Sequence, residues 1–429
     1  MLSELRVAGF KSYGAEQRLV LAPLTVLIGA NASGKSNLIE AMQLLAWLAR
    51  SHRLGDLGHA LREKELLVRG RVQDLAAERD VTLGCTVDDL ELELVLRLGA
   101  GAARVVEEEL RASESSSKLP YYRVERAAPE HGSELVVAYN NFAKGRNKPQ
   151  ITCVDQQAVF TQLLTPARFD ATHVSSQAKI PAACEKVSRA LGGMVFLDPQ
   201  PRAMREYSYL DETTLYPNGS NVSAVLADLC LAQGRADEVL EFVRALPEQD
   251  IRLVEFLQGP RNDVMVVLVE SFGGAERRVD ATLLSDGTLR VLAVAAAVLS
   301  VAAGSVVVIE EIDNGVHPSR AGVLMDALHR AASARGVQLL VTTHNPALLD
   351  AVPAGAIGDT VACYRDPESG ESRLQRLSEL DDFVALTARG PLGMLATSGA
   401  LDRFLKHRRT AEEREKQGQQ VLQLFRSSR

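Results

Sequence analysis

One segment of the chain has the residue types and the spacing of a phosphate-binding loop. Residues 29–36 read GANASGKS and fit the pattern G-x-x-x-x-G-K-[ST]. Glycines let such a loop curl until successive backbone N–H groups face a phosphate, and the N-terminus of the following helix adds positive potential. In this pattern Lys35 reaches the β- and γ-phosphates, and the Ser36 hydroxyl ligates Mg²⁺. The alternative, an ordinary glycine turn, does not require the strand before the loop and the helix after it that we expect here.

Two adjacent carboxylates follow a short apolar segment. Residues 306–309 read VVVI, which predicts a buried strand, and Glu310 and Glu311 come directly after it. Ligands of open α/β sheets bind at the carboxyl ends of the strands, and side chains alternate along a strand, so the two carboxylates should point in different directions. We expect Glu310 to hold Mg²⁺ through water and Glu311 to orient or deprotonate the attacking water. A solvated acidic strand end is the alternative.

A histidine and a helix start complete the candidate site residues. His344 follows VQLLVTT, a strand that we expect beside the apolar strand of residues 306–309, from where the ring could reach a γ-phosphate. A lone histidine is more often structural. Ser285 and Asp286, within LSDGT, precede a long apolar helix and suit its N-cap. The same helix N-terminus, with its hydroxyl, can also grip a phosphate, so both interpretations stay open.

The elements around these residues predict an α/β protein. Strands are expected at residues 5–10, 18–21 and 24–28, and the period changes to that of a helix from Lys35. Four β-like runs between residues 79 and 139 predict an antiparallel sheet appended to this unit: VTLGCTV, ELELVLRL, YYRVERA and ELVVAY. A helical pattern follows, and then a strand, a helix from about 286, the strand before Glu310, a further helix and the strand before His344.

Composition and charge limit the classes of protein. Forty-eight Lys and Arg against 55 Asp and Glu give a net charge of −7, which argues against a surface that is basic all over but leaves room for a local basic groove. Five scattered cysteines without a C-x-x-C pair argue against a disulfide framework or a zinc site and indicate a reducing cytosol. The longest apolar run, residues 291–303, is too short to cross a bilayer and predicts a buried helix. We therefore expect a cytoplasmic protein without a membrane partner.

Taken in order, the motifs resemble those of the ABC class of ATPases. Residues 29–36 match Walker A, LSDGT resembles the signature, VVVIEEIDNGVHP resembles Walker B with its D-loop, and His344 resembles the switch histidine. LRVAGFKSYG, LTVLIGANASGKSNLIEAM and VTTHNPALLD look like the SMC, RecF and OLD group rather than transporter cassettes. The insert lacks sustained heptads, and no DxD follows the cassette, so the resemblance is to a small RecF-like ATPase without coiled-coil arms or a TOPRIM domain.

The resemblance implies a fold and its division. The fold class is α/β, a P-loop ABC-type head with a mixed central sheet, an antiparallel β subdomain and an inserted helical lobe. Residues 1–140 would form the N-terminal half of the ATPase core, and residues 141–261 the mainly helical insert. Residues 262–365 would form the C-terminal half with the signature, Walker B and the switch histidine. Residues 366–429 would form a C-terminal extension.

The resemblance also implies a mechanism and its cofactors, ATP and Mg²⁺. Two heads would sandwich two ATP molecules in a homodimer or higher homo-oligomer, with Asp313 and Asn314 lying on the D-loop at the interface. Glu311 and His344 would be catalytic, and Glu310 with Ser36 would hold the metal. The implied ATP-binding residues are Gly29, Asn31, Ser33, Gly34, Lys35, Ser36, Asn37 and, from the other copy, Ser285 and Gly287.

The sequence departs from the family pattern in places. Glu310 stands where the family usually has Asp, and Asp286 and Thr288 stand where many relatives have Gly and Gln. Several residues compete for the Q-loop glutamine: Gln150, Gln156, Gln157 and Gln162. Phe10 or Tyr13 could stack on adenine, or both could be core aromatics.

Three functions agree with these motifs to different degrees. The leading one is an ATPase that acts on DNA or controls a separate effector, a nuclease or toxin, in DNA repair or anti-phage defence. The alternatives are the ATPase subunit of a membrane transporter and a non-hydrolysing ATP-controlled scaffold. ATP is preferred over GTP because no NKxD motif is present. In the tail, Val421, Leu424 and Phe425 have helical spacing and either dock on a partner or belong to a solvated charged helix.

Overall fold

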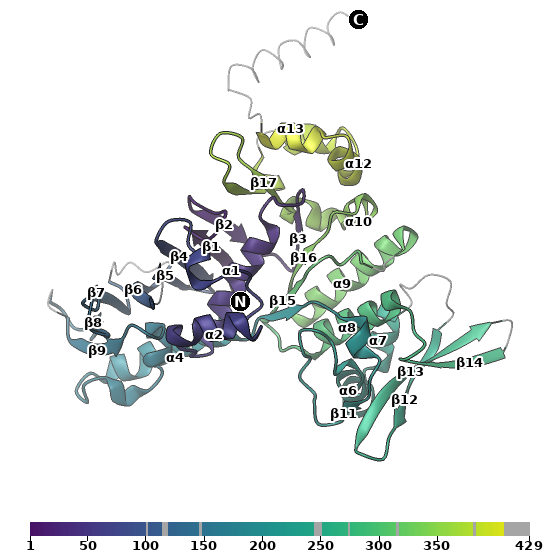
Figure 1. Cartoon of the computed structure of the whole chain (residues 1–429), viewed down its shortest axis with the longest axis horizontal. Helices are drawn as coiled ribbons and strands as arrows, with labels where there is room; N and C mark the ends of the chain where they lie inside the picture. Colours follow the sequence, from purple (N-terminus) through teal and green to yellow (C-terminus); the bar gives the residue numbers. More distant parts are fainter. Residues whose placement is uncertain are drawn as a thin grey trace, which may run out of the picture.

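Three sheets organise the described part of the chain (Figure 1). The computed structural model describes residues 1–99, 102–113, 119–145, 148–243, 251–272, 275–314, 317–380 and 383–406. Within these ranges the strands form sheets of eight, six and four strands. The six-stranded sheet carries the phosphate loop and is called the core sheet below.

The core sheet brings together strands from distant parts of the sequence. Its strands, in spatial order, are β10 (Val195–Leu197), β15 (Val306–Ile309), β16 (Gln338–Thr342), β3 (Leu24–Ile28), β17 (Val361–Arg365) and β18 (Ser372–Arg376). Neighbouring strands pair in parallel, except for the antiparallel β17 and β18. The strand before His344, β16, lies between the strand of the phosphate loop and the strand of Glu310, which confirms the predicted neighbour.

Alternation along the core strands divides their side chains between two hydrophobic cores. Val307 belongs to one core and Val308 to the other. On the first face the sheet is covered by α8 (Asp286–Ser300) and α9 (Ala321–Arg335). The predicted buried helix therefore exists as α8, and among the described residues no helix is long and apolar enough to cross a bilayer.

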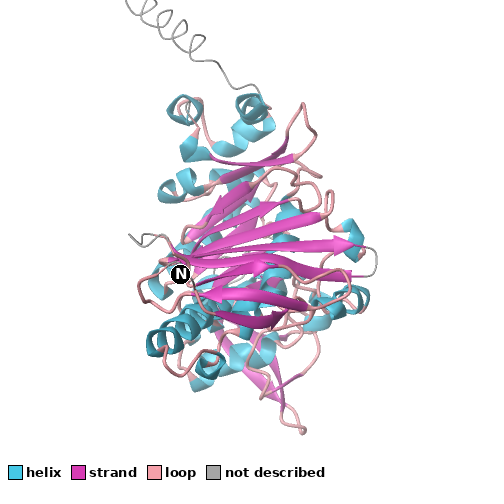
Figure 2. Ribbon diagram, turned by 90° about the vertical axis from the view of Figure 1, so that its left-hand side faces the viewer, coloured by secondary structure: helices cyan, strands magenta, loops and turns pink. Residues whose placement is uncertain are grey.

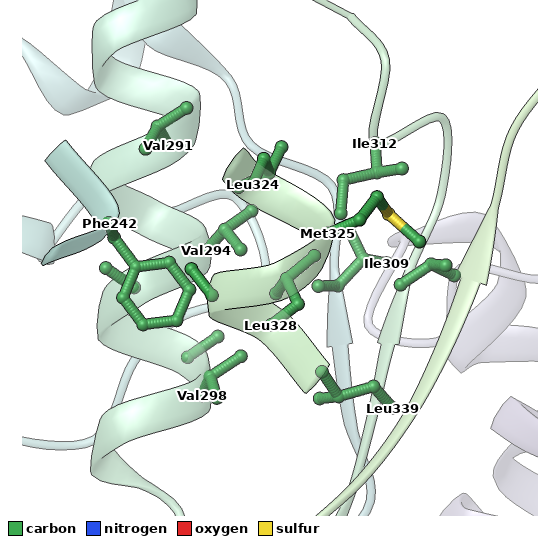
Figure 3. Packing of buried hydrophobic residues seen from close by; sticks show 14 of the residues in the cluster. Phe242, Val291, Val294, Val298, Ile309, Ile312, Leu324, Met325, Leu328 and Leu339 are labelled. Atoms are coloured by element: carbon green, nitrogen blue, oxygen red, sulfur yellow. The ribbon is translucent and has the colours of Figure 1, made fainter. Parts of the chain in front are cut away.

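The first core is built mainly of aliphatic side chains that meet between helices and sheet. Figure 3 shows Val294 and Val298 of α8 and Leu328 of α9 in one cluster with Ile309 and Leu339 of the core sheet. Each of these five side chains is at most 5% exposed. This packing fixes the distance between α8 and the strand that leads to Glu310.

The helix that follows the phosphate loop lies within the second core. In α1 (Lys35–Ala49) every residue from Leu38 to Ala49 is buried. Since even Glu40 and Gln43 are buried, the helix is covered on all sides. One side faces the core sheet, and the other faces the eight-stranded antiparallel sheet, since both contribute to the same core. The start of α1 is therefore held rigidly.

The eight-stranded sheet confirms the predicted antiparallel sheet. Figure 2 views the molecule from the side of this sheet. Its strands, in spatial order, are β2 (Gln17–Val20), β1 (Leu2–Ala8), β4 (Asp80–Val87), β5 (Leu90–Gly99), β6 (Ala102–Ala112), β7 (Tyr122–Arg126), β8 (Glu134–Tyr139) and β9 (Gln150–Val154). The sequence pattern missed β6 and β9.

The third sheet adjoins α8 through a group of short helices. Its strands are β11 (Ser208–Tyr209), β13 (Asp263–Phe272), β12 (Ile251–Gln258) and β14 (Ala275–Asp280). The helices beside it are α5 (Pro201–Met204), α6 (Val222–Ala227) and α7 (Ala236–Val243). Their buried side chains join those of α8 in one core. The strand predicted at residues 263–272 is β13.

Residues 141–261 pack on both sides of the core sheet. The helices α3 (Val159–Gln162) and α4 (Val174–Gly192) share the core of α1, while α6 and α7 share the core of α8. The same range also contains β9, β10, β11 and β12. The fourfold division of the chain given above stays a prediction.

The remaining elements are short and mostly lie at the periphery. The remaining α-helices are α2 (Leu57–Arg62), α10 (Pro346–Asp350), α11 (Phe383–Thr387), α12 (Leu392–Thr397) and α13 (Ala400–Lys406). Short helical turns lie at Leu54–Asp56, Val72–Asp74, Pro166–Arg168, Asp228–Ala232, Pro318–Arg320, Ala354–Asp359 and Leu377–Glu379. The tail prediction on Val421, Leu424 and Phe425 lies outside the described residues.

Candidate functional site

Backbone conformation and close packing both require glycine at positions 29 and 34 of the phosphate loop. Gly29 has φ +152° and Gly34 has φ +120°, a region that L side chains rarely adopt. A Cβ at position 29 would lie 2.2 Å from the Cys363 carbonyl oxygen, and one at position 34 would lie 2.2 Å from Ser372 Oγ. The loop can therefore approach β17 and β18 this closely only with glycine.

The carbonyl groups of the loop are engaged on the side of β17 and β18. Ser33 O accepts hydrogen bonds from Ser372 Oγ (2.6 Å) and Cys363 Sγ (3.4 Å). Ala32 O accepts one from Arg365 Nε at 2.9 Å. These three hydrogen bonds fix the loop carbonyls of Ala32 and Ser33 against β17 and β18.

The two aromatic candidates for adenine stacking are core residues. Phe10 and Tyr13 both have 0% exposure. The Tyr13 hydroxyl donates to Gly34 O at 3.1 Å, so this ring supports the phosphate loop from inside the core. A fully buried ring offers no face to a base, and the core interpretation of both residues therefore holds.

The start of α1 is a candidate anion site. Gly34 is its N-cap, no side chain caps it, and its first turn holds no acidic residue. The free backbone N–H groups and the helix dipole favour a negative ligand. Among the described residues Lys35 Nζ donates to two loop carbonyls, at 2.6 Å to Gly29 O and 3.1 Å to Ala30 O. Burial lowers the pKa of Lys35, and nearby carboxylates oppose this shift.

The oxygen donors beside this loop fit Mg²⁺. Ser36 Oγ donates to Glu310 Oε2 at 3.3 Å. Burial raises the pKa of Glu310, the charge of Asp198 adds to that, and the hydrogen bond from Ser36 opposes it. Mg²⁺ prefers oxygen ligands and usually keeps several waters together with substrate phosphates, so two protein ligands suffice. The longer side chain of Glu at this position still reaches Ser36.

Glu311 turns away from Glu310 through an unusual backbone conformation. Its φ is +49°, which is rare for a residue other than glycine. Its backbone N–H donates to Thr342 Oγ1 at 2.8 Å, and its Oε2 accepts from Asn314 Nδ2 at 2.7 Å. The Glu311 side chain is exposed at the edge of the core sheet. Because β15 ends at Ile309, the left-handed turn and not strand alternation sets its direction.

His344 lies against Asp313, the carboxylate of the D-loop. His344 Nδ1 is 3.7 Å from Asp313 Oδ2, the histidine side chain is 56% exposed, and the aspartate side chain is 7% exposed. Asp313 Oδ1 is buried without a hydrogen-bond partner. The negative charge of Asp313 also acts on Lys35. The structure therefore brings the switch histidine, the D-loop and the phosphate loop to one edge of the core sheet.

The signature residues lie apart from this edge. Ser285 is the N-cap of α8, and its Oγ accepts from Thr288 N at 3.1 Å, so the capping interpretation is correct. Leu283, two residues before it, is 66% exposed, whereas Leu284 is buried. In the part of the chain that the structure describes, no hydrogen bond or ion pair joins Ser285 or Gly287 to the phosphate loop.

The sequence pattern did not indicate that the segment after β10 belongs to the site. A pocket of about 260 Å³ lies beside Ser36 and Glu310, and Asp198, the first residue after β10, lines it together with Arg69 and Glu40. Three of the four glutamines considered for the Q-loop, Gln150, Gln156 and Gln162, instead make hydrogen bonds to residues of the eight-stranded sheet, and Gln157 donates to Ser51 O after α1. A strand of only three residues gives too short a pattern to be found from sequence.

A buried carboxylate in the same pocket was also missed. The Glu40 side chain is 5% exposed and pairs with Lys11 and with Arg69, whose Nε lies 2.5 Å from Oε1. Lys11 Nζ also donates to Arg69 O at 2.6 Å. Because Glu40 is one turn after Ser36 on α1, this network ties the segment of Arg69 to the metal end of the site.

Comparison with known proteins agrees with this geometry. A family model described as "AAA domain, putative AbiEii toxin, Type IV TA system" matches residues 24–75 and 213–350. Two curated relatives are proteins named DNA replication and repair protein RecF. The one from Gloeobacter violaceus is 43% identical over 98 residues, which are 23% of this chain and 24% of the relative. The one from Acaryochloris marina is 37% identical over 105 residues, 24% of this chain and 25% of the relative.

The chain thus aligns with about a quarter of the length of these curated relatives. Among solved structures, an SMC head bound to the C-winged helix domain of ScpA matches with a TM-score of 0.46 at 12% identity, covering 87% of this chain and 97% of that chain. The SMC head domain from Thermotoga maritima matches with a TM-score of 0.39 at 12% identity, covering 87% and 98%.

Proposed function

We propose that the chain, which matches an AAA family model and RecF proteins over part of its length, is a RecF/SMC-like ABC-class ATPase that binds ATP with Mg²⁺, hydrolyses it and pairs with a second copy around it. The observation that supports this most is the meeting of Lys35, Ser36, Glu310 and the His344–Asp313 pair at one edge of the core sheet. These groups are what phosphoryl transfer to water requires.

Binding of ATP begins with the attraction between its phosphates and the positive groups of the phosphate loop. The amides of residues 29–36 and the open start of α1 surround the phosphates, and Lys35 leaves the carbonyls of Gly29 and Ala30 to reach the β- and γ-phosphate oxygens. Ser36 and Glu310 would hold Mg²⁺, which would supply positive charge to offset that of the phosphates. The pairs that stiffen the loop keep it from rearranging when the nucleotide enters.

Hydrolysis needs a carboxylate that can accept a proton from water. Glu311 is exposed beside the proposed metal ligands. Among the described residues its carboxylate accepts a hydrogen bond from Asn314, and its backbone N–H donates to Thr342. When its carboxylate leaves Asn314, it orients the water for attack on the γ-phosphorus, in line with the bond to ADP. His344, whose Nδ1 faces Asp313, presents Nε2 to the γ-phosphate.

A second copy completes the site. Ser285 and Gly287 stand at the start of α8, which covers one face of the core sheet, whereas α1 lies on the other. Among the described residues no hydrogen bond or ion pair joins them to the phosphate loop of their own chain, and we assign them to the ATP of the partner. A twofold arrangement would form two such composite sites at once.

Mass measurements test the pairing. Light scattering should give a doubled mass with Mg²⁺ and a non-hydrolysable ATP analogue, and the mass of one chain with ADP. Turnover per chain should rise with protein concentration, because each active site needs two chains. A single-chain mass in every nucleotide state, with turnover independent of concentration, would refute the composite site.

We further propose that the ATPase acts on DNA in the cytoplasm, because the curated relatives carry DNA replication and repair in their names. With a net charge of −7, binding should be modest and should weaken as salt rises. A second candidate, control of a separate effector protein, is favoured by the toxin–antitoxin description of the matching family. DNA binding that ignores salt between 50 and 200 mM, the range over which phosphate contacts lose about a thousandfold or more, would favour the second candidate.

A further inference from the structure

An acidic side chain stands where the signature helix should receive a phosphate. Asp286 is the first residue of α8, directly after the N-cap Ser285. Its side chain is 70% exposed, and its Oδ1 is 2.8 Å from Arg205 Nη2. The carboxylate therefore lies next to the backbone amides and the hydroxyl that the proposed function assigns to the γ-phosphate of the partner's ATP.

Two charges of the same sign at this place would oppose the proposed contact. The N-terminus of a helix binds anions through its free amides and its positive dipole end. A carboxylate in the first turn is favourable to the helix itself, but it repels a triphosphate that approaches the same amides. Something must offset the charge of Asp286 if the helix is to hold a phosphate.

The guanidinium of Arg205 is placed to do so. Its Nη2 donates both to Asp286 Oδ1 at 2.8 Å and to Leu284 O at 2.9 Å. It thereby links the residues on either side of Ser285. The carboxylate is drawn toward Arg205, and the turn before α8 is held at the same time.

Arg205 itself has little freedom to move. It follows α5, whose Met204 is 0% exposed and belongs to the same core as α8. The Arg205 side chain is 28% exposed, which is less than the usual surface arginine of an ion pair here, such as Arg189 at 78%. A pair with one partner anchored in this way loses less side-chain entropy than two free surface chains.

We propose that Arg205 is a positioning residue for the signature: it neutralises Asp286 and holds the Leu284 carbonyl, so that the Ser285 hydroxyl and the first amides of α8 stay open to the γ-phosphate of the other chain. The inference rests on the proposed function. It also accounts for an aspartate at a position where many ABC-class relatives have glycine.

Epistasis between the two residues tests this role. In a Glu311→Gln background, Arg205→Ala should weaken ATP-dependent dimerisation about tenfold, the scale of one charge at a partly buried helix end. Asp286→Gly should dimerise about as well as the parent, and Arg205→Ala with Asp286→Gly should recover to within about twofold, because no charge remains to be neutralised. The defect of Arg205→Ala should shrink as salt rises.

Controls separate this role from a general loss of structure. Arg202→Ala changes an exposed arginine of the same short helix and should leave dimerisation unchanged. Arg205→Lys keeps the charge and should retain most of the affinity. A double variant as weak as Arg205→Ala would overturn the proposal in favour of a purely structural role, because rescue by Asp286→Gly cannot repair a misfolded turn.

The outcomes distinguish this inference from the proposed function. A parent protein that binds ATP but never dimerises with it overturns both. A parent that dimerises, with Arg205→Ala equal to it in affinity and in salt dependence, overturns the inference alone. Binding of Mg²⁺–ATP to a single chain, measured by calorimetry, should be the same for the parent and for every variant of this set.

Discussion

The backbone N–H of Glu311 donates a 2.8 Å hydrogen bond to the side-chain hydroxyl of Thr342. Thr342 is the last residue of β16, two residues before His344, and is 2% exposed. Its own carbonyl accepts from Ile312 N at 3.1 Å. Thr342 of β16 thus fixes the turn that carries the candidate catalytic carboxylate. The bond from the Glu311 N–H to its hydroxyl also compensates for part of the strain of the left-handed backbone at Glu311.

Thr342→Val should therefore reduce turnover more than nucleotide binding. Valine has nearly the same shape but no hydroxyl, so the Glu311 amide would lose its partner, at a cost of about 1–3 kcal/mol. We expect kcat to fall about tenfold or more, with KM for ATP changed less than twofold, in a steady-state phosphate-release assay. Thr342→Ser, which keeps the hydroxyl, is the matched control and should keep most of the activity. Equal kcat in the Val and Ser variants would contradict the role of this bond.

Lys35→Ala should abolish nucleotide binding. The ammonium group is the one cation of the phosphate loop among the described residues, and its present partners are two loop carbonyls that a phosphate can replace. We expect the rise in Tm caused by Mg²⁺–ATP in the wild type to disappear. Lys179→Ala, an exposed lysine on α4, should keep the rise. An undiminished ATP-induced rise in Lys35→Ala would mean that the phosphates are held elsewhere.

Glu311→Gln should bind ATP yet turn it over poorly, and so accumulate as a dimer. The amide keeps the shape of the carboxylate but cannot take a proton from water. Light scattering with Mg²⁺–ATP should show a dimer that persists, while the wild type returns to single chains as ATP is consumed. Turnover equal to that of the wild type would exclude Glu311 as the group that activates water.

Local patterns predicted the parts of the site that depend on neighbours in sequence. The loop of residues 29–36, the carboxylates after β15 and the N-cap at Ser285 are each defined within a few residues, and each lies where its pattern indicates. Contacts between distant segments left no such trace. Arg205 meets Asp286 across 81 positions, and β10 pairs with a strand more than a hundred residues later, so neither could be inferred from spacing.

The strand β6 was missed for a different reason, which also leads to a pH dependence. Residues 107–109 are three consecutive glutamates, which hide the alternation of a half-buried strand. The middle one, Glu108, points into the core at 2% exposure and accepts hydrogen bonds from Tyr122 OH and from the amides of Val159 and Phe160, each at 2.6 Å. These donors lie 14, 51 and 52 residues away in the sequence, so the local pattern of β6 cannot reveal them.

Burial of this carboxyl predicts that stability falls as pH rises toward neutrality. Desolvation raises the pKa of Glu108 from 4.5 to about 7, against the three hydrogen bonds, which favour the charged form. Since the folded-state pKa lies above the unfolded one, the stabilising contribution is complete below pH 4.5 and is lost as the pH rises through about 7. The full loss amounts to about 3 kcal/mol at most. Urea unfolding at about pH 5 and about pH 8, on either side of this titration, measures the loss in free energy of unfolding.

Glu108→Gln removes the titration and should flatten this pH profile. Its absolute stability should be lower at pH 5, because a glutamine oxygen accepts fewer of the three hydrogen bonds than a carboxyl group can. Glu109→Gln is the matched control, since Glu109 lies next along β6 with a side chain 37% exposed and near Arg111. Its profile should follow that of the wild type. If Glu108→Gln and Glu109→Gln kept the same fall in stability between the two pH values, the dependence would have to arise from other groups, and Glu108 would be ionised throughout.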